Sequence, residues 1–148
     1  MAGCSFKLDV SSLKRRLQKA RQMRGEQQKL MKAIGEAMVS STIQRFNDGV
    51  GPDGKEWTPS RRAKAEGGQT LVKSAALKNS HVYEASHDTV YWGPSGAEAY
   101  AAIHQSGGMA GRGRKVKIPA RPYLGINDED MAEIRALMFD FMCQYFKP

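Results

Sequence analysis

The sequence has few cysteines and no long apolar run. Its two cysteines, Cys4 and Cys143, lie near opposite ends of the 148 residues, and neither belongs to a Cys-x-x-Cys pair. That spacing excludes the usual structural zinc site, and we expect two free thiols in a reducing cytoplasm. No apolar run approaches the roughly 20 residues that cross a bilayer, and the first residues lack the apolar stretch of a secretory signal. We therefore expect neither a transmembrane helix nor export.

Motifs for catalysis are also missing. The sequence contains no Gly-x-Ser-x-Gly, Walker loop or His-Glu-x-x-His. His81, Glu84 and His87 have a spacing of three, which does not place side chains on one face of a strand, so a metal site is only a weak alternative. Residues 51–54 are glycine-rich but lack the Gly-Lys-Ser/Thr of a phosphate loop, which favours a tight turn. We expect no enzyme, no catalytic or metal-binding residues and no cofactor.

The length and composition are those of a single globular domain, because 41% of the residues are hydrophobic and 26% are charged. The 23 Lys and Arg residues outnumber the 15 Asp and Glu residues, which gives a net charge of +8. Such an excess favours a polyanionic neighbour: nucleic acid, a membrane surface or an acidic protein. Net charge alone does not distinguish these partners.

The charge is divided into blocks along the chain. Residues 1–32 contain nine basic and two acidic residues, and residues 111–125 contain five basic residues and no acid. Residues 81–110 contain three acids and no Lys or Arg, and residues 126–148 contain five acids and two basic residues. This pattern favours surfaces of opposite sign that contact neighbouring proteins. The alternative is a set of solvated helix faces.

The N-terminal part, residues 1–46, is predicted to be helical. Apolar residues spaced by three or four, Phe6, Val10, Leu13 and Leu17, predict a short amphipathic helix, and a second helix is predicted from about Glu26 to Phe46. The turn formers that follow end this helix. We expect a loop over residues 47–70, mobile from 56 to 68.

Residues 71–148 alternate short helices and strands. The predicted elements are a short helix at 74–80, a hairpin at 81–85 and 89–92, a helix at 97–105, a flexible basic loop at 107–117, a strand at 116–119 and a last helix with Asn127 as its N-cap. This order predicts a single α+β domain, with a small antiparallel sheet, two or three longer helices and extended loops.

Four motifs in this order resemble the phage virion morphogenesis proteins, a family that includes the Mu-like G protein and relatives of the P2-type tail completion protein. The resemblance extends from about residue 40 to the end. It rests on Arg45-Phe46 with Gly51–Pro59, on Leu71–Ser80, on Val90–Gly93 with Tyr100–Gly108, and on Ile118–Gly125 before the last helix.

The resemblance implies a structural, non-enzymatic virion protein of a contractile-tailed phage or prophage, which completes the tail and joins it to the head as a ring in the neck. The implied partners are further copies of the chain, as a hexamer or dodecamer, other neck, connector or tail proteins, and non-specifically the genomic DNA in the lumen; no membrane is implied. The protein would be assembled in the host cytoplasm. The alternatives are a capsid-assembly factor of the same family and a small non-specific DNA-binding module.

Two groups of residues are candidates for contacts. Trp57 is expected either to cover the core above the second helix or to anchor a neighbouring subunit, and Arg121 is expected to pair with an acid. The expected subunit interface comprises Trp57, Pro59, Arg61, Arg62, Arg121 and Tyr123. The residues expected to contact DNA or an acidic partner are Arg112, Arg114, Lys115 and Lys117.

Overall fold

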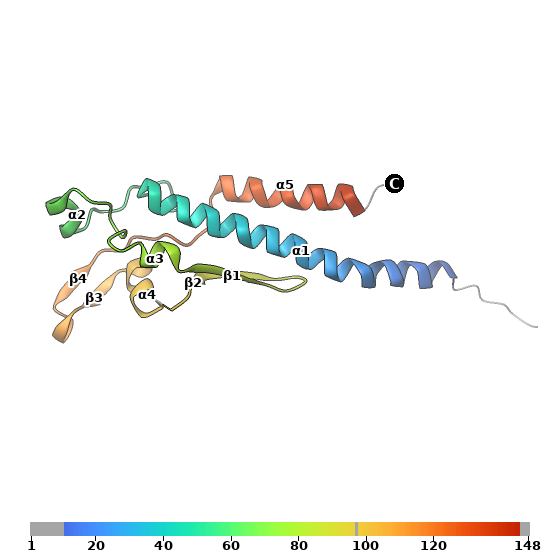
Figure 1. Cartoon of the computed structure of the whole chain (residues 1–148), viewed down its shortest axis with the longest axis horizontal. Coiled ribbons are helices and arrows are strands. Elements are labelled where there is room, and N and C mark those ends of the chain that lie inside the picture. The colour runs from blue at the N-terminus through green and yellow to red at the C-terminus, as the bar shows by residue number, and fades with distance from the viewer. Residues whose placement is uncertain (1–10, 97, 146–148) are drawn as a thin grey trace, which may run out of the picture.

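The computed structural model describes residues 11–96 and 98–145 and has the expected α+β fold (Figure 1). The elements are α1 (Ser11–Asp48), α2 (Arg61–Glu66), α3 (Ala76–Asn79), β1 (His81–Ala85), β2 (Val90–Pro94), α4 (Glu98–Ser106), β3 (Gly108–Ala110), the 3-10 turn η1 (Arg112–Arg114), β4 (Val116–Ile118) and α5 (Asp128–Tyr145). Figure 1 shows an elongated molecule with α1 along its axis, between α5 and the β1–β2 hairpin.

The prediction of two N-terminal helices is wrong, because α1 is one continuous helix of 38 residues. Residues 18–26 are mostly good helix formers, and their single Gly25 costs only about 1 kcal/mol relative to alanine, so no residue there ends the helix. The helix ends at Gly49, which has a φ of +71° and donates its N–H to the Arg45 carbonyl at 2.8 Å. The predicted residues 6–10 lie outside the described residues.

The hairpin predicted at 81–85 and 89–92 is confirmed, with its second strand at Val90–Pro94. β1 and β2 pair antiparallel, with Tyr83 opposite Trp92. The Tyr83 ring packs so closely on Gly35 of α1 that a Cβ at Gly35 would lie 2.5 Å from Tyr83 Cδ2. The Tyr83 hydroxyl also donates to Glu36 Oε1 at 3.0 Å. Gly35 therefore sets how closely the hairpin approaches α1.

The expected single sheet is replaced by two sheets of two strands each. β3 pairs antiparallel with β4, with Gly108 opposite Ile118, and neither strand joins the β1–β2 sheet. The predicted flexible loop at 107–117 is therefore a second, short hairpin. Its turn includes Gly111 and Gly113, whose φ angles of +81° and +72° are accessible to glycine at little cost.

The segment between α1 and α3 is more ordered than the predicted loop. Val50 and Glu56 form a β-bridge around a tight turn in which the Gly54 N–H donates to the Gly51 carbonyl at 3.0 Å, as expected for residues 51–54. Residues 61–66 form α2, whose N-cap Ser60 accepts a bond from the Ala63 N–H at 3.1 Å. Short-range capping thus gives a helix where a mobile loop was expected.

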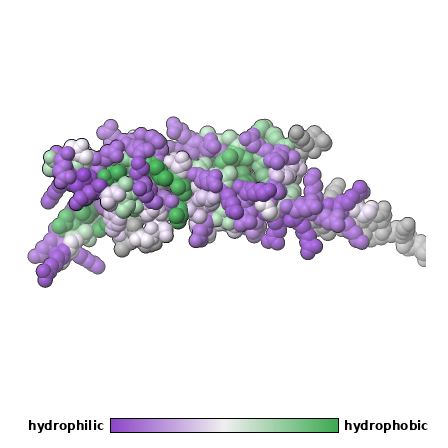
Figure 2. Space-filling view, viewed as in Figure 1, coloured by the Kyte–Doolittle hydropathy of each residue, from purple (hydrophilic) through white to green (hydrophobic). Residues whose placement is uncertain are grey.

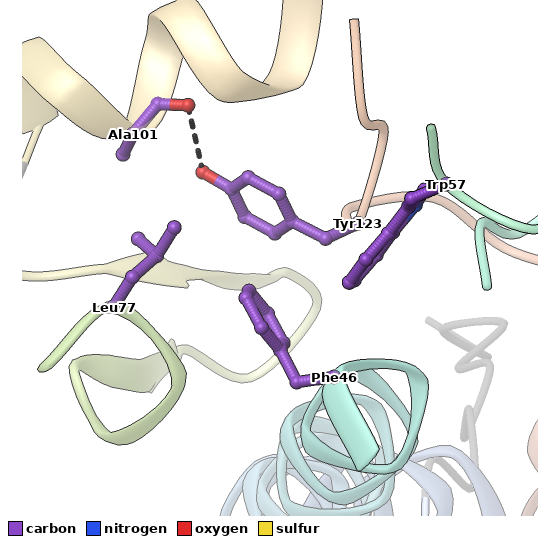
Figure 3. Packing of buried hydrophobic residues seen from close by; sticks show 5 residues of the cluster. All are labelled: Phe46, Trp57, Leu77, Ala101 and Tyr123. Carbon is purple, nitrogen blue, oxygen red and sulfur yellow. Dashed lines mark hydrogen bonds between the residues drawn. The ribbon is translucent and has the colours of Figure 1, made fainter. Parts of the chain in front are cut away.

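The core lies near the C-terminal end of α1 (Figure 3). It joins α1 to α3, α4 and two connecting segments through five buried residues, Phe46, Trp57, Leu77, Ala101 and Tyr123. The Phe46 ring lies 5.4 Å from Trp57, edge-on, and 5.3 Å from Tyr123. Figure 3 shows the Tyr123 hydroxyl pointing at the Ala101 carbonyl, to which it donates at 3.1 Å. Trp57 donates its Nε1–H to the Pro122 carbonyl at 2.8 Å, which places it in the core.

Candidate functional site

A buried ion pair joins the two long helices. Arg45 on α1 pairs with Asp130 on α5, and their side chains are 6% and 4% exposed. Arg45 Nη1 also donates to the carbonyls of Tyr123 and Gly125, at 3.0 and 2.9 Å, and the Ser41 hydroxyl donates to Asp130. These bonds offset the cost of removing both charges from water. The pair therefore fixes the start of α5 against the end of α1.

Asp130 also takes part in the N-cap of α5. Asn127 Oδ1 accepts the Asp130 N–H at 2.8 Å, and Asp130 Oδ2 accepts the Asn127 N–H at 2.9 Å, which forms a reciprocal capping box. The predicted N-cap at Asn127 is confirmed. The roles of Arg45 and Asp130 were missed, because the two residues lie 85 positions apart. The one available signal was an arginine among the apolar residues of the predicted helix.

The predicted interface residues do not form one surface. Trp57, Arg121 and Tyr123 are buried within the chain. Arg121 donates its Nε–H to the Thr58 carbonyl at 2.7 Å and lies near no carboxylate of a described residue, so the expected acid partner is wrong. Arg62 is half-buried and donates to the Gln69 carbonyl at 2.6 Å. Only the exposed members of the set, Pro59 and Arg61, are open to a neighbouring subunit.

The predicted anion-binding residues do lie together. Their side chains are exposed around the turn and second strand of the β3–β4 hairpin, which we call the basic tip: Arg112, Arg114, Lys115 and Lys117. Figures 1 and 2 show this hairpin at the opposite end of the molecule from the N-terminal part of α1. Met109 and Val116 on the same hairpin are 50% and 45% exposed. The tip therefore combines positive charge with uncovered apolar surface.

α5 has an inner and an outer apolar surface. Ile134, Leu137 and Phe141 are half-buried on the side that also carries Asp130, which contacts α1. Four other large apolar side chains of the helix are 37–65% exposed: Met131, Met138, Phe139 and Met142. An apolar helix surface of this kind is typical of a protein contact site.

Burial perturbs several titratable groups near the core. Desolvation lowers the pKa of His81, whose ring packs 5.5 Å from Phe46 and whose Nδ1 lies 3.2 Å from the Lys78 carbonyl. Desolvation, and then the charge of Arg121, lower the pKa of His104. Burial raises the pKa of Tyr123 to about 12. All three shifts follow from burial: the His81 ring packs on Tyr123, with 5.3 Å between the ring centroids, and the His104 ring packs on Tyr100 at 5.2 Å.

Within residues 11–96 and 98–145, no three side chains of the His, Cys, Asp and Glu types are arranged to hold a metal ion. None of the described helices is long and apolar enough to cross a membrane. Cys143 is an exposed free thiol, and Cys4 lies outside the described part of the chain.

The chain is similar to a prophage protein and to a family of phage proteins. The chain is 41% identical over 105 residues to the "Mu-like prophage FluMu G protein 2" of Haemophilus influenzae strain Rd, an alignment that covers 71% of this chain and 70% of that protein. No solved structure matches the chain. The model of the phage virion morphogenesis family matches residues 8–142, which include α1, the core and most of α5. The chain therefore belongs to the phage virion morphogenesis family.

Proposed function

We propose that the protein is a ring-forming component of the neck of a contractile-tailed phage or prophage particle, where it completes the tail and joins it to the head. Membership of the phage virion morphogenesis family carries the proposal, because it assigns the chain a role in virion assembly. A structural role agrees with the arrangement of the described part, in which the shifted histidines and tyrosine lie within the packing around the core.

The surface supports assembly from several copies. A ring of identical subunits uses two different complementary patches on each copy. The outer surface of α5 leaves Phe139 65% and Met142 55% exposed, which is apolar area that a neighbouring protein would cover. The basic N-terminal part of α1 and the acidic N-terminal turn of α5 supply opposite charges. We propose that such a ring contacts other neck, connector or tail proteins.

The basic tip supports a second contact, with the genomic DNA in the lumen of the ring. Its four cations are exposed and form no ion pair with any residue in the described ranges, so they are open to phosphate groups. The tip has no aromatic side chain for base stacking, so binding would be independent of sequence. This observation also keeps the DNA-binding module as the alternative function.

Deleting the gene from an inducible prophage tests the proposal. We expect filled heads and free tails that are not joined, or tails of abnormal length, in electron micrographs of the lysate. The wild-type gene supplied in trans should restore joined, infectious particles. Normal particles without the gene would contradict a role in assembly, and missing or misshapen heads would instead assign the protein to capsid assembly.

A further inference from the structure

The N-terminal part of α1 extends beyond the elements that cover the rest of the helix. The hairpin reaches α1 at Arg24, whose Nη2 lies 3.5 Å from His87 Nε2, and α5 reaches it at Glu26, which accepts a bond from the Tyr145 hydroxyl. Figure 1 shows α1 continuing past both. We call residues 12–23 the α1 overhang. At 1.5 Å per residue it is about 18 Å long.

The overhang is a helix of one charge sign. It contains five Lys or Arg residues and no Asp or Glu. Arg15 and Lys19 are both exposed and lie one turn apart, where like charges repel. The first turn of α1 has no acidic residue to interact favourably with the positive end of the helix dipole. An anionic partner beside the overhang would offset both the repulsion between its cations and the uncompensated helix dipole.

The described surface contains an acidic groove at the other end of α1. The groove has a volume of about 580 Å³ and lies between α1, the turn at residues 51–54 and the N-terminal half of α5. Its acidic side chains, apart from the paired Asp130, are Asp48, Asp53, Asp128, Glu129 and Glu133. Asp53 pairs with Lys55 at 3.4 Å, whereas the three exposed acids of α5 form no ion pair with another described residue.

The overhang and the groove complement each other, but they cannot meet within one chain. They lie at opposite ends of a single helix, and the Arg45–Asp130 pair fixes α5 beside the groove end. The groove would repel DNA, so a nucleic acid bound to the overhang would leave the groove uncompensated. A second copy of the chain compensates both surfaces at once.

We infer that the α1 overhang of one copy docks in the acidic groove of a second copy. The inference rests on the proposed multi-copy assembly and names its contact. Arg15 and Lys19 face carboxylates that include Glu129 and Glu133, and the overhang gains an anionic neighbour that no described residue of its own chain provides. Repeated from copy to copy, a contact between two different surfaces closes into a ring if the rotation permits.

Two charge-reversed variants test this contact in the full chain. The overhang variant is R15E/K19E and the groove variant is E129K/E133K, and all four side chains are exposed in the single copy. A matched control, R112E/R114E, places the same charge change in the basic tip. Circular dichroism and thermal unfolding verify that each variant folds. Mass is then measured across a concentration series, for each variant alone and for an equimolar mixture of the first two.

We expect each of the two variants alone to associate at least about tenfold more weakly than the wild type, because like charges then face each other across the contact. Their mixture should recover assembly, with the two variants alternating in even-numbered assemblies, and the control should assemble like the wild type. Assembly of either variant alone at the wild-type concentration, or no recovery in the mixture, would overturn the contact. The contact would also be overturned if R15E/K19E assembled like the wild type and lost only its affinity for duplex DNA.

The same measurement separates this inference from the proposed ring. A wild-type chain that stops at a dimer, with the same behaviour of the variants, supports the docking contact and contradicts the ring. If the wild type forms a ring and both charge-reversed variants form it at the same concentration, the ring is supported and the contact is overturned. A wild type that stays monomeric at every concentration contradicts both, whereas the gene deletion still decides the role in virion assembly.

Discussion

The guanidinium of Arg45 and the carboxylate of Asp130 form an ion pair between the last turns of α1 and the first turn of α5, with both side chains more than nine-tenths buried. Asp130 accepts bonds from Ser41 and from the Asn127 backbone as well. One carboxylate therefore links two helices, the cap of α5 and the segment that carries Tyr123. Its loss would affect all of these contacts together.

Replacing Asp130 with alanine should lower the free energy of unfolding by about 3–5 kcal/mol, because Arg45 would remain buried without its counter-charge. Asp128→Ala is the matched control on the same turn, and it should cost at most about 1 kcal/mol because that side chain is exposed. Urea denaturation followed by circular dichroism gives both values. A loss below 1 kcal/mol for Asp130→Ala would show that the pair does not hold the helices together.

Two glycines of α1 should respond in opposite directions to the same substitution. Gly35→Ala places a methyl group 2.5 Å from Tyr83 Cδ2 and should destabilise the fold by about 1–3 kcal/mol as the hairpin shifts. Gly25→Ala meets no atom within 4 Å and should stabilise it by up to about 1 kcal/mol. Thermal or urea unfolding of the two variants provides the comparison. Equal effects would contradict the close packing of Tyr83 on α1.

Stability should fall as the pH rises above about 10. Burial raises the pKa of Tyr123 to about 12, so between the ordinary tyrosine pKa of about 10 and that value the unfolded chain loses the proton while the folded chain keeps it. Tyr123 lowers the free energy of unfolding by at most about 1.4 kcal/mol per pH unit in this range. Tyr123→Phe should flatten the dependence of urea denaturation on pH in this range, whereas Tyr91→Phe, at an exposed position, should leave it unchanged.

Acidification should also weaken the fold. The pKa values of His81 and His104 are lowered by burial, so below the ordinary histidine value of about 6.5 the unfolded chain binds protons that the folded chain does not. The contribution of the two histidines to the free energy of unfolding is therefore fully present above about pH 6.5. It is lost as the pH falls towards their lowered pKa values. Two-dimensional NMR titration should show both rings changing at lower pH than in the chain unfolded in urea. Titration at the unfolded value would contradict their burial.

Neutralising the basic tip should reduce any affinity for duplex DNA. Replacing Arg112, Arg114, Lys115 and Lys117 with glutamine removes four cations, and the slope of log affinity against log salt should become shallower by up to about 3.6. Fluorescence anisotropy at several salt concentrations measures that slope. Because the four side chains are exposed, folding should be unaffected. An unchanged slope would show that the tip does not contact DNA.

Local signals in the sequence were enough to place most elements. Asn127 and the acids after it predicted the start of α5, and the β-branched and aromatic residues of 81–85 and 89–92 predicted the hairpin. Both signals involve neighbours in sequence, and the same neighbours interact in the structure. The error at α1 is also local: the apolar spacing from Phe6 to Leu17 and the separate apolar face after Glu26 suggested two helices, although a change of apolar pattern does not outweigh the cooperativity of a long helix.

Features that depend on distant residues were not predictable. Nothing near Arg45 indicates Asp130 as its partner, and Arg121 was assigned an acid although it bonds to the Thr58 carbonyl. Periodicity likewise assigns Met138 and Met142 to one apolar face of α5, but which part of that face α1 covers depends on tertiary packing. The basic residues of the tip can be grouped from the sequence because they are neighbours in it, whereas the acidic groove combines three segments and is visible only in the fold.

The separation of Arg45 and Asp130 also sets an order of events during synthesis. Asp130 is made 85 residues after Arg45, which at about 5–20 residues per second is a delay of roughly 4–17 s. Throughout that interval the last turns of α1 lack the carboxylate that neutralises them. The nascent chain therefore completes its central ion pair only when α5 leaves the ribosome, and the core becomes stable late in translation.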